Sequence, residues 1–222
     1  MNAITIVSGG LDSVTLAYLL ASQGHDLHLL SFNYGQRHKK ELDYARRAAL
    51  ALHARYDVLD LSALTPFLSG SALTDDIDVP EGHYAAPTMA VTVVPNRNAI
   101  MLAVAYAVAV AEGAEMVATA VHAGDHFIYP DCRPEFIQAF DAMERYATDG
   151  YAADGLHLNA PFVNMSKAEI VTLGASLFVP YADTWSCYKG GEFHCGVCGT
   201  CVERREAFQL AGVTDPTIYM SR

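Results

Sequence analysis

Short runs of apolar and β-branched residues alternate along the chain with segments whose apolar positions recur at helical spacing. The runs predict strands at residues 3–8, 26–33, 56–61, 116–121 and 156–160. The other segments predict helices at 14–22, 39–53, 98–112, 134–147 and 202–210, with one more starting at the capping box of residues 166–169. Gly24 and Gly113 mark helix C-termini, and Pro134 opens a helix at its first turn.

Strands that alternate with helices predict a parallel, doubly wound α/β sheet of the Rossmann-like type. Ligands of such sheets bind beyond the carboxyl ends of the strands. Residues 8–13, 33–35 and 122–133 each follow a predicted strand, so we expect them to share one rim of the sheet. The length of 222 residues and the absence of internal repeats predict a single domain spanning 1–222.

The charge balance limits the classes of partner that the protein can bind. The 14 basic residues face 25 acidic ones, for a net charge of −11, and this field repels a nucleic-acid backbone at long range. We therefore expect a small-molecule substrate and no nucleic acid. The longest apolar run, residues 99–111, is shorter than the ~20 residues that cross a bilayer. We expect no membrane partner and a cytoplasmic location, where thiols stay reduced.

The first strand–helix junction carries the glycine loop, Ser8-Gly9-Gly10-Leu11-Asp12-Ser13. Glycines permit a tight turn, and a helix that begins there offers free N–H groups and a positive dipole end to an anion. The loop lacks the Walker lysine and the third glycine of the dinucleotide fingerprint. It resembles the PP-loop of the ATP pyrophosphatases, also called adenine nucleotide alpha hydrolases, which adenylate a substrate. Asp12 is then a candidate to hold Mg²⁺ bound with ATP or to orient the pyrophosphate.

Four of the five cysteines, Cys187, Cys195, Cys198 and Cys201, fall in one glycine-rich stretch, here called the cysteine segment (residues 185–208). Thiolates spaced by two residues suit a tetrahedral zinc ion, so we predict one structural Zn²⁺. An iron–sulfur cluster, a disulfide or a ligand role for His194 are the alternatives. Cys132 lies outside this stretch and is either a small buried hydrophobic residue or a catalytic thiol.

Four further segments, at residues 32–38, 94–98, 129–136 and 185–188, join the glycine loop in a specific combination. Together they resemble the 7-cyano-7-deazaguanine synthase family of queuosine biosynthesis, from residue 4 to about 208. The resemblance implies an ATP-dependent ligase that adenylates 7-carboxy-7-deazaguanine, lets ammonia displace AMP, and dehydrates the amide to a nitrile through a second activation. It implies four zinc-binding cysteines, matching those above, and a homodimer. The predicted ATP-binding residues are Ser8, Gly9, Gly10, Leu11, Asp12, Ser13, Val14, Thr15 and Arg97.

Substrate residues can be predicted from the chemistry of a flat, guanine-like acid. A carboxylate accepts the ring N–H and amino group together, and Asp131 or Glu135 is the candidate. Arg37, Arg97, Arg133 and Lys167 are candidate cations for the charged partners. Tyr129 or Phe127 is the candidate for stacking on the ring. Each has a plainer interpretation: Lys167 as a solvated or paired cation, Asp131 as a helix cap.

Two other functions stay open at this level. One is a PP-loop enzyme that modifies tRNA, a thiolase or a lysidine-type ligase, and the other is a non-enzymatic zinc-ribbon module. The acidic charge and the missing RNA-binding extension disfavour the first. The acidic stretch 74–82 matches no motif, and its role is left open.

Overall fold

The computed structural model describes residues 1–220 and centres on a five-stranded parallel sheet. The strands are β1 (Asn2–Ile6), β2 (Asp26–Asn33), β3 (Arg55–Asp60), β4 (Met116–Ala118) and β5 (His157–Asn159). Their order is β3-β2-β1-β4-β5, and Ile4 of β1 pairs with His28 on one side and Val117 on the other. The strand order therefore reverses between β1 and β4, where doubly wound sheets bind their ligands.

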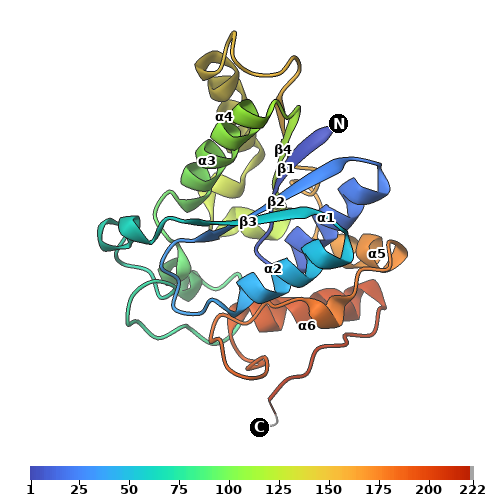
Figure 1. Cartoon of the computed structure of the whole chain (residues 1–222). Coiled ribbons are helices and arrows are strands. Elements are labelled where there is room, and N and C mark those ends of the chain that lie inside the picture. The colour runs from blue at the N-terminus through green and yellow to red at the C-terminus, as the bar shows by residue number, and fades with distance from the viewer. Residues whose placement is uncertain (221–222) are drawn as a thin grey trace.

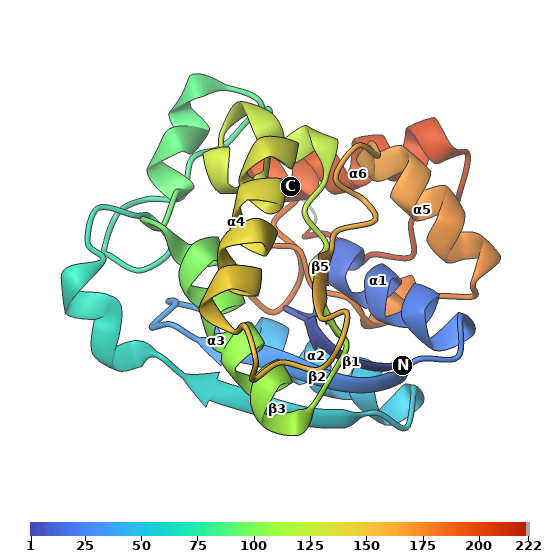
Figure 2. The same cartoon turned by 90° about the horizontal axis from the view of Figure 1, so that it is seen from above.

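Helices cover both faces of the sheet (Figure 1). They are α1 (Leu11–Ser22), α2 (Lys40–Ala51), α3 (Arg97–Glu112), α4 (Pro134–Ala147), α5 (Lys167–Ser176) and α6 (Gly199–Ala211). α3 and α4 bury one apolar cluster against the sheet, and α1, α2, α5 and α6 bury another on the opposite face, an arrangement also visible from above (Figure 2). These layers confirm the predicted doubly wound α/β fold.

Local signals set most helix ends. The capping box is complete: Ser166 Oγ accepts from the Glu169 N–H at 3.3 Å, and a Glu169 carboxylate oxygen accepts from the Ser166 N–H at 2.7 Å. Gly113 ends α3 in the left-handed conformation, at φ 64°. α6 starts at Gly199, three residues before the predicted start, because Cys198 already has the extended backbone of an N-cap. The last helix thus begins inside the cysteine segment.

The long connection between β3 and α3 contains only two short 3₁₀ helices, Ser62–Phe67 and Pro87–Thr92. Its acidic stretch, residues 74–82, is held against other elements by hydrogen bonds and an ion pair. Arg37 donates to the Ile77 carbonyl at 2.7 Å, Lys189 pairs with Glu81 at 2.6 Å, and the Gly82 N–H donates to the Val197 carbonyl at 3.0 Å. This connection therefore covers the cysteine segment. Within residues 1–220, no helix has the length and apolar character needed to cross a bilayer.

Candidate active site

A cavity of about 270 Å³ opens at the carboxyl ends of the strands, at the reversal between β1 and β4. Its walls come from the glycine loop, the start of α3, the stretch after β4 and the cysteine segment. The expectation that loops following separate strands share one rim is therefore confirmed for the glycine loop, Tyr34 and the residues around His122.

The glycine loop takes its shape from contacts behind it. Gly9 has φ +85°, and a Cβ there would lie 2.2 Å from the Glu41 carbonyl oxygen of α2, so only glycine fits. The Ser8 and Ser13 hydroxyls lie 3.1 Å apart and hydrogen-bond each other. Gly10 caps α1, and the first turn of that helix faces the cavity with N–H groups that have no intrahelical partner. Gly9 is thus needed for packing on α2, while Gly10 lies on the cavity wall.

One side of the cavity is an ionic end, made of Asp12, His122, Asp125, Lys167 and Glu203. The Lys167 ammonium lies 2.5 Å from a Glu203 oxygen and 3.3 Å from an Asp12 oxygen. Burial lowers the pKa of Lys167, but the three carboxylates outweigh burial and hold that pKa above its usual range. The second Asp12 oxygen is buried without a hydrogen-bond partner in the described chain. An anion-binding loop thus adjoins a fixed cation and a carboxylate oxygen that is free to take a ligand.

A second group of lining residues, here called the aromatic chamber, consists of Tyr34, Glu41, Arg97, Tyr129 and Tyr188. An Arg97 N–H donates to the Tyr34 hydroxyl at 3.2 Å, and the guanidinium lies 5.3 Å from the centre of that ring. Burial raises the pKa of Tyr34 to about 12, so its hydroxyl stays protonated. Flat rings around a cation and a carboxylate suit a planar polar ligand.

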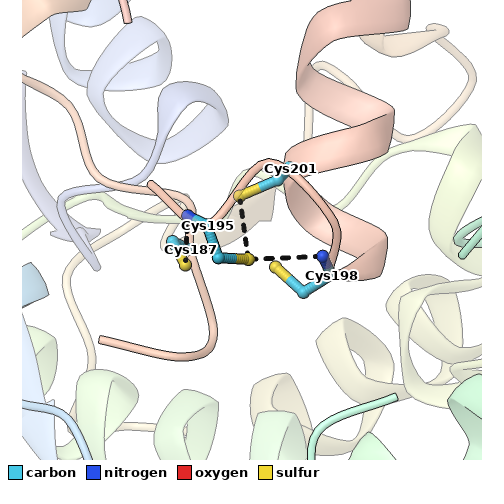
Figure 3. Close-up of side chains that lie close together, drawn as sticks. All are labelled: Cys187, Cys195, Cys198 and Cys201. Atoms are coloured by element: carbon cyan, nitrogen blue, oxygen red, sulfur yellow. Dashed lines mark hydrogen bonds between the residues drawn. The ribbon is translucent and has the colours of Figure 1, made fainter. Parts of the chain in front are cut away.

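The four clustered cysteines form a candidate metal centre (Figure 3). Their four Sγ atoms lie within 4.8 Å of one another, and Cys195 and Cys201 are 3.9 Å apart. A tetrahedral zinc ion with Zn–S bonds of ~2.3 Å needs sulfurs about 3.8 Å apart, so this set fits such an ion. No disulfide joins any of the five cysteines within residues 1–220. His194 instead accepts a hydrogen bond from the Ser186 N–H at 3.1 Å.

The cysteine segment also builds the cavity. Trp185, Ser186 and Tyr188 flank Cys187, and Glu203 follows Cys201 by two residues on α6; all four line the cavity wall. The candidate metal centre therefore adjoins, along the chain, residues that line both parts of the cavity.

The predicted site residues separate into two groups. Those on the cavity are Ser8, Gly10, Leu11, Asp12, Ser13, Arg97, Tyr129 and Lys167. Those outside its lining are Gly9, Val14, Thr15, Asp131, Arg133 and Glu135. Asp131 accepts from the Asn98 N–H at 3.2 Å and so caps the start of α3, and Phe127 is 77% exposed.

The pattern of the sequence did not single out Glu41, Tyr188, His122, Asp125 or Glu203 for the site. Glu41 and Glu203 look like surface positions of amphipathic helices, and only the packing turns them toward the cavity. Glu41 lies three residues beyond the 32–38 segment. The other four fall within stretches already named: Tyr188 in 185–188, His122 and Asp125 in 122–133, and Glu203 in the cysteine segment. Cys132 reaches the cavity wall, but burial and the nearby Asp125 and Asp131 carboxylates raise the pKa of its thiol. It is therefore poorly suited to act as a nucleophile.

The strand order, the glycine loop at the first strand–helix junction and the cavity above it define a PP-loop type α/β protein. The family model described as queuosine biosynthesis protein QueC matches residues 2–212, and the chain belongs to this family. A relative from Chelativorans sp. (strain BNC1) is 63% identical over 99% of this chain and 94% of its own length. One from Ruegeria pomeroyi is 62% identical over the same shares. Both are named 7-cyano-7-deazaguanine synthase.

Solved structures support the fold alone. NMN synthetase from Francisella tularensis superposes with a TM-score of 0.50 at 18% identity, covering 96% of this chain and 77% of that one. A 4-thiouridine synthetase, solved with RNA and bound ATP, superposes with a TM-score of 0.51 at 13% identity, covering 95% of this chain and 50% of that one.

Proposed function

We propose that the chain is a 7-cyano-7-deazaguanine synthase, an ATP-dependent ligase that converts 7-carboxy-7-deazaguanine and ammonia into the nitrile. The observation that carries the proposal is the single cavity in which an anion-binding loop faces a chamber for a flat ring. The names of the relatives that match almost the whole chain support the same activity.

ATP is expected at the ionic end. The free N–H groups of the first turn of α1 and the Ser8 and Ser13 hydroxyls would hold its phosphates, and Lys167 would neutralise the charge that develops there. Asp12, with its unpartnered oxygen, is the residue that would hold Mg²⁺ bound with ATP. The aromatic chamber is then left for the deazaguanine, so that its carboxylate faces the α-phosphate.

The chemistry follows from this placement. A carboxylate oxygen attacks the α-phosphorus and pyrophosphate leaves; ammonia then attacks the acyl carbon and AMP leaves with that oxygen, giving the amide. In a second round the amide oxygen attacks the α-phosphorus of another ATP. AMP leaves with this oxygen while the nitrogen loses its two protons, and the C≡N bond forms. Each carboxylate oxygen thus ends in one AMP.

We also propose that the cysteine segment binds one structural zinc ion. Four sulfurs within 4.8 Å of one another surround room for a single ion, whereas an iron–sulfur cluster must fit several irons and sulfides between its thiolates. Metal analysis of the purified protein tests this assignment: one zinc without iron supports it, and iron with acid-labile sulfide overturns it.

A homodimer, a cytoplasmic location and the absence of a nucleic-acid partner belong to the same proposal. The net charge of −11 supports the last of these. Light scattering on a sizing column tests the dimer, which a monomer mass would overturn.

The test of the activity is incubation with ATP–Mg²⁺, ammonium and substrate labelled with ¹⁸O at both carboxylate oxygens, read by mass spectrometry. We expect the nitrile together with two AMP molecules, each carrying one label. Release of ADP, or unlabelled AMP, would contradict adenylation. The absence of any nitrile would overturn the proposed function.

A further inference from the structure

Glu41 is a carboxylate that the proposed catalytic steps do not use. It stands in the first turn of α2, beside the glycine loop, and lines the aromatic chamber. One of its oxygens accepts from the Gln36 side chain at 3.2 Å. No salt bridge within 4.0 Å joins Glu41 to a cation in residues 1–220, and the Gln36 contact is the one hydrogen bond that its carboxylate makes there. The carboxylate therefore faces the cavity with acceptor capacity to spare.

A desolvated carboxylate without a charged partner lowers the stability of the folded protein. Burial raises the pKa of Glu41 to about 7, although Arg97 and the Gln36 hydrogen bond act in the opposite direction. An amide at this position could keep a bond to Gln36 without that cost. The carboxylate thus makes sense as a group whose partners arrive with a ligand.

The ring edge of a deazaguanine presents, in order, an amino donor, a ring N–H donor and a carbonyl acceptor. A carboxylate accepts two parallel N–H bonds, and a guanidinium beside it can donate to the carbonyl. Arg97 is the neighbouring cation, close enough to lower the pKa of Glu41, and both residues line the chamber. Asp131 and Glu135, the carboxylates predicted from the sequence, are outside the cavity lining.

We infer that Glu41 determines the specificity of the chamber, accepting the ring N–H and the 2-amino group of the deazaguanine while Arg97 donates to the ring carbonyl. This inference rests on the proposed function, since it assigns the chamber to the substrate of that reaction. It replaces both carboxylates predicted from the sequence by one on α2.

The experiment compares two ligands on three proteins. The ligands are 7-carboxy-7-deazaguanine and its analogue without the 2-amino group; the proteins are the wild type, Glu41→Gln and the control Asp43→Asn. Asp43 is exposed on the same helix, two residues further, and is not part of the cavity lining. Calorimetry gives Kd for each ring and for ATP, and thermal unfolding gives the Tm of each free protein.

We expect the wild type and Asp43→Asn to bind the full ring about 10- to 100-fold more tightly than the analogue. Glu41→Gln should reduce this ratio to about one while changing the Kd for ATP less than twofold. Its Tm at pH 8 should equal or exceed that of the wild type, because the desolvated charge is gone.

Other outcomes overturn the inference. An unchanged ratio with a lower Tm would make Glu41 a packing residue, and a selective loss of ATP affinity would place it at the adenine. If the wild type discriminates between the rings but forms no nitrile, only the proposed function fails. If the wild type binds neither ring, both the proposed function and the inference about Glu41 fail.

Discussion

Both ends of the cavity hold charged groups away from water, but these groups are partnered differently in the two ends. At the ionic end the cation is already paired, because Lys167 bridges Asp12 and Glu203, and His122 lies 3.5 Å from Asp125. In the aromatic chamber the Glu41 carboxylate has one amide donor among the described residues, and burial raises its pKa to about 7. The ionic end is therefore organised before ATP arrives, whereas the chamber is completed by its ligand.

The difference matches what each end must do. A triphosphate is recognised by charge, so a fixed cation serves any nucleotide that enters. A ring must be told from similar rings, and discrimination is strongest where the wrong ligand leaves a buried polar group unpaired. The cysteine segment joins the two, since it supplies Glu203 to one end and Tyr188 to the other.

Loss of the metal centre should have the largest effect, because it removes this shared support. Cys201→Ser is expected to lose the bound metal, since the hydroxyl of serine is a poor zinc ligand, and structural zinc contributes roughly 10 kcal/mol or more to folding. Affinity for both ATP and the deazaguanine should then fall, with activity below detection. Metal content, Tm and the two Kd values measure this.

The matched control is Cys132→Ala, which removes a thiol outside the metal centre. It should retain one metal ion per chain. If Cys201→Ser lost its metal but still bound ATP and the deazaguanine normally, the cysteine segment would not be needed to support the two ends of the cavity.

At the ionic end, Lys167→Met should lower kcat by about 10³-fold, the usual cost of removing one preorganised group that stabilises charge. It also leaves the Asp12 and Glu203 carboxylates buried without their cation, which costs ~3–5 kcal/mol of stability. Affinity for the deazaguanine should change little, because the chamber is built from other residues. Single-turnover rates and calorimetry separate these effects.

Lys39→Met is the surface control. Lys39 is exposed just before α2, and its loss should change stability by less than about 0.5 kcal/mol. If Lys167→Met weakened ring binding as much as catalysis, the division of the cavity into two ends would be wrong.

The sequence was most informative where chemistry resides in contiguous residues. The glycine loop, the cysteine spacing, the Pro134 start and the capping box are all local patterns, and each occurs in the structure as predicted. The fold class followed from periodicity, because helices and strands that alternate have few ways to pack.

The chamber could not be predicted in this way. Its residues come from two helices and three loops spread along the chain, and which side chain reaches the cavity depends on how α2 and α3 dock on the sheet. Asp131 shows the limit clearly. Its chemistry was suitable, but tertiary packing uses it to cap α3.

The chamber also predicts a pH dependence of substrate affinity. Below about pH 7 Glu41 is protonated and must release its proton to accept two N–H bonds, so Kd should rise about tenfold per pH unit between pH 7 and 6 and stay level above 7. The groups around it, Arg97, Tyr34 and Tyr56, keep their charge state across this range. Calorimetry at several pH values measures the slope, and Glu41→Gln should abolish it. A slope that persists in Glu41→Gln would assign the proton to another group.

The smallest effect is expected at Asp131, and it separates the two carboxylate assignments. In Asp131→Asn the remaining side-chain oxygen can still accept from the Asn98 N–H, and the side chain does not line the cavity. The substitution should therefore cost less than about 1 kcal/mol of stability, from the lost charge at the α3 N-terminus. Substrate Kd should change less than twofold, against a loss of about tenfold or more in Glu41→Gln. The reverse order of the two Kd effects, measured side by side, would return ring recognition to Asp131 and require the chamber to lie closer to the start of α4.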